Sequence, residues 1–287
     1  DERLPSAAAL HAVLEEGEDG AWWRDRAGAI QVATKRPLRR IRIPRETGVY
    51  GRDAELARLR ALYEESRDGD GRVVLIEGEA GIGKSRLVDE LVGRLQRDGE
   101  DVNFLFGSYP PSGAATVSGA FSTAYRGQFG EAGSAAWLRQ SPSLVPAFDA
   151  LLAGEPLPEG RASLTKDSLQ TCFVQATRSL AAERPTIVLI DDLHFAPDEG
   201  RALFTALAMA VPGHRVLLVG TTRPGLDPTW SVNLDRLGGV RLGLDRLGRD
   251  ALEALLAESM HSEYLASEIA DRVAAKSDGN PFFVFEI

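Results

Sequence analysis

The chain has 287 residues, 44% of them hydrophobic and 26% charged, which indicates one large globular domain or two modest ones. Its net charge of −9 argues against nucleic acid as a partner of this stretch, and no apolar run approaches the roughly 20 residues of a membrane helix. A single cysteine, Cys172, excludes an internal disulfide and fits a reducing compartment, so we expect a cytoplasmic protein without a membrane partner.

Residues 1–46 predict a linker or a small module that contains β-structure. The alternation through residues 29–32 favours a short strand, and the tryptophan pair at 22–23 belongs either to the core of that unit or to an interface. A basic run follows at 37–44. Two readings of this run stay open: a solvated edge strand or linker, and a contact to a partner module or nucleic acid.

The phosphate-binding pattern Gly-x-x-x-x-Gly-Lys-Ser occupies residues 78–85, between an apolar strand pattern at 73–76 and an amphipathic helix. Glycines let several backbone N–H groups point at a phosphate chain, and the helix N-terminus adds positive potential. Lys84 is predicted to reach the β and γ phosphates, and Ser85 to bind Mg²⁺. The predicted nucleotide contacts of this stretch are Gly78, Glu79, Ala80, Gly81, Ile82, Gly83, Lys84, Ser85 and Arg86.

A second acidic motif follows a predicted strand at 187–190. Between it and a strand at 102–106, the residues 108–164 predict a helical insertion interrupted by glycine and proline. The strand at 187–190 ends in Asp191 and Asp192, where one carboxylate can hold Mg²⁺ and its neighbour can orient a water. We assign Asp191 to the metal and Asp192 to the water.

A fourth strand, predicted at 215–220, leads into Arg223. If this strand lies beside the phosphate-loop strand, Arg223 faces the γ-phosphate; a surface turn before the next proline is the alternative. His194, two residues beyond the acidic pair, lies either near the γ-phosphate or on a solvent-facing loop.

The predicted strands end with 240–244, and helical patterns follow. Asn280 is expected to cap a further helix that Pro281 opens. We therefore divide the chain, after its first 46 residues, into a nucleotide-binding domain at 47–245 and a helical domain at 246–287. The chain starts without methionine and ends inside an apolar run, so we expect a segment of a longer protein.

The ordered set of motifs resembles the STAND family of signal-transduction ATPases, most closely the modules of large LuxR-type regulators and of bacterial multidomain kinases or cyclases. The resemblance covers roughly residues 48–287. It implies an α/β P-loop fold with a parallel sheet of order 5-1-4-3-2 and a small helical domain after it. The motifs are Gly51-Arg52, the phosphate loop, Asp191-Asp192, Arg223 and the run Gly279-Asn280-Pro281-Phe282-Phe283.

The resemblance also implies residue roles. Gly51 and Arg52 would sit at the adenine and ribose, Pro281 would pack on the base or sugar, and Arg223 would sense the γ-phosphate. Two departures stand out. The second acidic residue is Asp192 and not the glutamate of efficient motors, and the winged-helix domain that follows in the family is expected to be absent from this sequence, which ends at Ile287.

Our hypothesis from the sequence is an ATP-driven switch in a signalling or transcriptional regulator, with ATP, ADP and Mg²⁺ as ligands and slow hydrolysis that resets it. Its partners would be sensor and effector domains of the same protein. The full-length protein would form an ATP-dependent homo-oligomer, and this segment with ADP would be a monomer. The alternatives are an AAA+ motor or loader, a small-molecule kinase, and a scaffold that binds nucleotide without chemistry.

Overall fold

The computed structural model describes residues 48–111, 118–157, 159–226, 230 and 235–285. The chain divides into two compact units, Asp1–Pro44 and Arg45–Ile287, and every described residue lies in the second. The predictions for residues 1–46 therefore lie outside the described residues. Within the described part, every helix is too short or too polar to cross a membrane.

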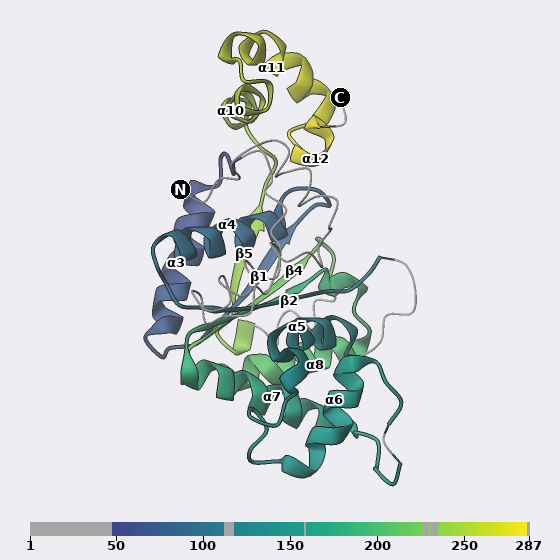
Figure 1. The fold of residues 1–287 in the computed structure, drawn as a ribbon. Coiled ribbons are helices and arrows are strands. Elements are labelled where there is room, and N and C mark those ends of the chain that lie inside the picture. The colour runs from purple at the N-terminus through teal and green to yellow at the C-terminus, as the bar shows by residue number, and fades with distance from the viewer. Residues whose placement is uncertain (1–47, 112–117, 158, 227–229, 231–234, 286–287) are drawn as a thin grey trace, which may run out of the picture. The chain divides into compact units, whose positions relative to one another are not determined.

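Among the described residues, five parallel strands form the sheet, in the order β2-β3-β4-β1-β5, which confirms the order that the resemblance implies. Strands β3 and β4 are buried along their whole length, because helices cover both faces of the sheet (Figure 1). The strands are β1 (Arg72–Gly78), β2 (Asn103–Ser108), β3 (Thr186–Asp191), β4 (Val216–Thr222) and β5 (Val240–Leu244).

Alternating strand residues serve two separate cores. Val74 and Ile76 of β1 pack with α3 and α4 on one face, whereas Val73 and Leu75 belong to the core on the other face, which α5 to α8 cover. The helices around the sheet are α3 (Asp53–Arg67), α4 (Lys84–Arg97), α5 (Gly119–Phe129), α6 (Val145–Ala153), α7 (Lys166–Glu183) and α8 (Asp198–Ala210).

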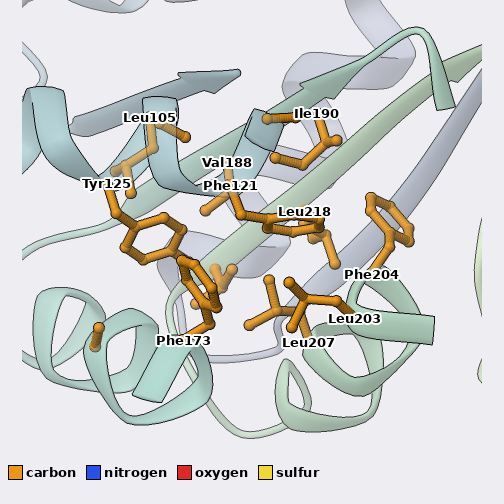
Figure 2. Packing of buried hydrophobic residues seen from close by; sticks show 14 of the residues in the cluster. Leu105, Phe121, Tyr125, Phe173, Val188, Ile190, Leu203, Phe204, Leu207 and Leu218 are labelled. Carbon is orange, nitrogen blue, oxygen red and sulfur yellow. The ribbon is translucent and has the colours of Figure 1, made fainter. Parts of the chain in front are cut away.

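The segment between β2 and β3 is held to the sheet by aromatic side chains. Phe121 and Tyr125 of α5 meet Phe173 of α7 with ring centroids 5.6 and 5.0 Å apart, and Phe148 of α6 meets the same ring at 5.0 Å. Figure 2 shows Phe121, Tyr125 and Phe173 beside strand residues such as Val188. The Tyr125–Phe173 and Phe148–Phe173 pairs are edge-to-face and the Phe121–Phe173 pair is tilted, and aromatic pairs in such geometries add stabilisation beyond the burial of their area. Short 3-10 turns, η1 (Gly130–Ala132) and η2 (Pro142–Leu144), connect α5 and α6.

In the part of the chain that the structure describes, three helices follow β5 and share a small core of their own. Leu252 and Leu255 of α10 (Arg249–Met260) pack against α11 (Glu263–Ser277) and the short α12 (Pro281–Val284). The side chain of Asn280 accepts the N–H of Phe282, and Pro281 is the first residue of α12, which confirms the predicted cap. This capped turn determines where α12 begins, directly beside the phosphate loop.

Candidate nucleotide site

The phosphate loop connects β1 to α4, the strand–loop–helix arrangement that the pattern requires. Gly81 and Gly83 have φ of 76° and 100°, in a region that side-chain-bearing residues rarely adopt. Gly83 is the N-cap of α4 and, within the described part of the chain, no side chain caps that end. The first N–H groups of α4 are therefore available to an anion.

Lys84 lies folded along its own loop. Its ammonium donates to the carbonyl oxygens of Gly78, at 2.9 Å, and Glu79, at 2.8 Å, and the residue is only 7% exposed. Burial lowers the pKa of Lys84 from its ordinary value, although Asp192 and Asp191 oppose the shift. A phosphate beside this ammonium would replace neutral carbonyl partners with anionic ones, which form stronger hydrogen bonds.

Asp191 and Ser85 offer a pair of oxygen ligands. The Ser85 hydroxyl donates to Asp191 Oδ2 at 2.7 Å, and the Thr221 hydroxyl donates to Oδ1 of the same carboxylate. Oxygen ligands of this kind fit Mg²⁺, which usually takes one or two protein oxygens together with phosphate and water. Among the described residues no cluster of three or more His, Cys, Asp or Glu side chains could hold a metal, and a site of this type does not need one.

Asp192 is held in an unusual backbone conformation at the end of β3. Its φ is 58°, and its N–H donates to the Thr221 hydroxyl at 2.9 Å. Its carboxylate lines the cavity described below and is 32% exposed. Burial, and then Asp191, raise the pKa of Asp192, which makes this carboxylate a better proton acceptor than an ordinary aspartate.

His194 lies beside Asp192 and is largely buried, which favours the first of the two alternatives left open by the sequence over a solvent-facing loop. Its Nδ1 is 3.8 Å from Asp192 Oδ1, and its side chain is 14% exposed. Among the described residues neither ring nitrogen has a hydrogen-bond partner. Burial, followed by the nearby charges of Arg223 and Lys84, lowers the pKa of His194, which favours the neutral ring.

Arg223 follows β4, which pairs with β1 directly beside the phosphate loop. Its side chain lines the same cavity as Lys84 and Asp192, and its guanidinium carbon lies 5.4 Å from the centre of the Phe195 ring. The ring face stabilises the cation and limits its orientations. The structure thus places Arg223, the carboxylates of Asp191 and Asp192, and Lys84 at one end of the sheet.

The cavity has a volume of about 410 Å³ and walls from two parts of the chain. The loop and strand ends form one wall, and the segment around α10 and α12 forms the other. Several lining residues were not predicted as nucleotide contacts from the sequence, although Phe282 belongs to the motif run at 279–283 and Tyr50 precedes the Gly51-Arg52 motif. These residues are Gly48, Val49, Tyr50, Leu247, Leu255, Phe282 and Phe285; the predicted residues in the lining are Arg52, Ala80, Gly81, Ile82, Gly83, Lys84, Ser85, Arg86, Asp192, Arg223 and Pro281.

Four predicted contacts lie differently from the rest, because Gly78 and Glu79 are outside the cavity lining and Gly51 and Arg52 make other contacts. Gly51 is outside the lining: its φ is 64°, and a Cβ there would come within 2.5 Å of the Cβ of Ala251 on α10, so it provides close packing. Arg52 is in the lining, but its guanidinium donates to the carbonyl oxygen of Asp245 at 2.5 Å and is only 3.4 Å from Glu55. The guanidinium of Arg52 is thus already partly paired with protein groups that hold it in the cavity wall.

Replacing Asp191 and replacing Asp192 should affect different properties of the site. We expect Asp191→Asn to weaken Mg²⁺-dependent nucleotide binding about tenfold, because the amide cannot replace an anionic metal ligand. Asp192→Asn should mainly slow hydrolysis, since its carboxylate faces the cavity without bonding Ser85. Titration calorimetry with and without Mg²⁺, and single-turnover hydrolysis, measure the two quantities. Equal effects of both variants on both quantities would contradict this division.

Comparisons with known proteins include a match to a family profile and a bacterial relative. Residues 48–219 match the profile of the AAA ATPase domain. An uncharacterised protein of Rhizobium meliloti (strain 1021) is 28% identical in an alignment of 262 residues that covers 83% of this chain and 24% of that protein. The chain thus spans about a quarter of the length of that relative.

Solved structures are similar in fold at low identity. The Drosophila origin recognition complex bound to DNA has a TM-score of 0.54 at 16% identity, over 90% of this chain and 58% of that chain. A STAND protein with a tetratricopeptide repeat sensor from Pyrococcus horikoshii has a TM-score of 0.49 at 18% identity, over 86% of this chain and 31% of that chain. At these identities the likeness concerns the fold alone.

Proposed function

Because the chain belongs to the AAA ATPase domain family, we propose that it is the nucleotide-dependent switch module of a larger signalling or regulatory protein. ADP would stabilise a closed arrangement of the nucleotide-binding domain (47–245) and the helical domain (246–287). Exchange for ATP would release it, and slow hydrolysis would restore it.

The cavity lined from both sides carries this proposal. Lys84 and Ser85 line it from the loop, while Pro281 and Phe282 line it from α12. A nucleotide in this cavity would contact both bodies at once. Such a ligand stabilises their closed arrangement by its differential affinity for that arrangement, which is the energetic requirement of a switch.

The proposed chemistry is in-line attack of water on the γ-phosphate. Lys84 would bind the β and γ phosphates, Arg223 would neutralise charge at the γ-phosphate, and Asp192 would orient the water and accept its proton. Ser85 and Asp191 would hold Mg²⁺, which when bound neutralises phosphate oxygens. Aspartate is one methylene shorter than glutamate, so we expect hydrolysis to be slow.

The proposed partners are a nucleotide and further domains of the same protein. The Rhizobium relative is about four times as long as the matched stretch, which supports the presence of additional domains. An ATP-dependent homo-oligomer of the full-length protein fits the same scheme. Nucleic acid is a poorer candidate for this segment, because its net charge is −9.

The switch requires that the protein distinguish ATP from ADP, and Arg223 tests this requirement. We expect Arg223→Ala to lower the ratio of ATP to ADP affinity about tenfold, because a charge-assisted hydrogen bond to the γ-phosphate forms only with ATP. Titration calorimetry with a nonhydrolysable ATP analogue and with ADP gives the ratio. An unchanged ratio would return Arg223 to the role of a surface turn residue, and the absence of hydrolysis in a single-turnover assay would leave a scaffold instead of a switch.

A further inference from the structure

Three charged side chains connect the phosphate loop to the helical region; we call them the loop clasp (Glu79, Arg246 and Asp278). Arg246 Nη2 donates to Glu79 Oε1 at 3.0 Å and to Oε2 at 2.9 Å, and its Nε reaches Oε2 at 3.2 Å. Its Nη1 forms an ion pair with the Asp278 carboxylate. One guanidinium thus joins two carboxylates that lie about two hundred residues apart in the sequence.

The positions of these residues show which segments of the chain the loop clasp joins. Glu79 is the second residue of the phosphate loop, and its carbonyl accepts a hydrogen bond from Lys84. Arg246 lies between β5 and α10, and Asp278 is the C-cap of α11. The clasp therefore fastens the segment that enters the helical region, and the turn that leads into α12, to the loop predicted to hold the phosphates.

Neutral hydrogen bonds beside the clasp run between the same segments. The Asn280 side chain donates to the Ala80 carbonyl oxygen at 2.8 Å, and the Leu247 N–H donates to the Gly279 carbonyl oxygen, also at 2.8 Å. All of these contacts join protein to protein. The loop and the helical region are therefore held together partly by groups that a nucleotide does not supply.

Solvent exposure sets the strength of the clasp. The side chains of Arg246 and Glu79 are 43% and 50% exposed, and Asp278 is 80% exposed. Single exposed ion pairs contribute little, whereas a forked arginine that binds two carboxylates is stronger and is still weakened by salt. A contact of this strength is suited to setting a rate of opening, because it can break without unfolding either part.

We propose that the loop clasp slows nucleotide exchange by holding the helical region over the phosphate loop. Arg246 also neutralises Glu79, whose carboxylate would otherwise add negative charge to a loop that binds a polyphosphate. This inference rests on the proposed nucleotide site and adds its regulation: opening of the clasp permits release, and closing retains the nucleotide. Arg246 thus acts as a positioning residue, through Glu79.

Charge reversal at Arg246 tests the proposal in the complete chain, with fluorescently labelled ADP and Mg²⁺. We expect Arg246→Glu to accelerate ADP dissociation about tenfold, a change equivalent to about 1.4 kcal/mol. The milder Arg246→Gln should accelerate it less. Raising the salt concentration should accelerate release from the unaltered chain more than from Arg246→Gln, because the ion pairs are already lost in that neutral variant.

The chain offers a matched control in Arg241. Its guanidinium binds Asp235 through two hydrogen bonds of 2.9 Å, with side chains 41% and 46% exposed, and neither residue lines the cavity. Arg241→Glu should release ADP at the unaltered rate. Thermal denaturation of both variants separates a general loss of stability from an effect on the clasp.

Hydrogen exchange of the α12 amides provides a readout that needs no nucleotide. In the unaltered chain these amides should be protected, and Arg246→Glu should increase their exchange, while Arg241→Glu should not. Unchanged ADP dissociation in Arg246→Glu, or an equal acceleration in Arg241→Glu, would overturn the clasp. Failure of the unaltered chain to bind ADP would instead refute the proposed function, and α12 exchange would still decide whether the clasp holds the two parts together.

Discussion

Replacing Lys84 with alanine is expected to lower the affinity for ATP and ADP at least about a hundredfold while the fold survives. The ammonium makes its hydrogen bonds to two carbonyl oxygens of its own loop, so its removal breaks no contact between distant elements. What is lost is a set of charge-assisted hydrogen bonds to phosphate, each about twice as strong as a neutral bond. Titration calorimetry gives the affinities, and thermal denaturation reports the fold.

Lys166 provides the control for this variant. It is the exposed first residue of α7, on an element that contributes no residue to the cavity lining. Lys166→Ala should therefore bind both nucleotides as the unaltered chain does. If Lys84→Ala also retained full affinity, the phosphate loop would not be the nucleotide site, and the proposed switch would lose its ligand.

The features predicted well from the sequence depend on local patterns. The glycines and lysine of the phosphate loop fall between a strand and a helix that periodicity alone identifies. Asp191 ends one buried strand and Arg223 follows another, and parallel strands bring their carboxyl ends to one edge of the sheet. The order of the strands came from the family resemblance, because periodicity does not specify which strands are neighbours.

The features that the sequence did not reveal depend on contacts between distant segments. Gly51 matches a family motif, yet its close neighbour is Ala251, and nothing in the local pattern indicates that a helix two hundred residues later requires the space. The local pattern likewise does not indicate that Glu258 of α10 accepts the N–H of Gly48 at the cavity wall. In the sequence, Arg246 is a charged residue between two predicted elements, and only the fold shows that it lies beside Glu79.

The contact between Gly81 and α12 leads to the second large expected effect. A Cβ on Gly81 would lie 2.5 Å from the Cβ of Phe282, and the residue has φ of 76°. Gly81→Ala should therefore displace α12 and also strain the loop, by about 1–2 kcal/mol for the left-handed conformation. We expect ADP affinity to fall about fiftyfold, because binding must reverse both changes. Calorimetry measures the affinity, and α12 hydrogen exchange detects the displacement.

The variant Gly83→Ala distinguishes the effect of crowding at α12 from the effect of backbone strain in the phosphate loop. Its φ is 100°, and among the described residues no atom lies within 4 Å of the Cβ that alanine would add, so Gly83→Ala strains the loop without touching α12. Phe282→Gly removes the crowded Cβ from the other side. Relative to Phe282→Gly alone, which also removes a side chain that lines the cavity, Gly81→Ala should therefore cost about tenfold less in ADP affinity than it does with Phe282 present, whereas the cost of Gly83→Ala should show no such recovery. Equal recovery in both combinations, or none in either, would show that α12 does not rest on the phosphate loop when ADP is bound, and the closed arrangement on which the switch depends would fail.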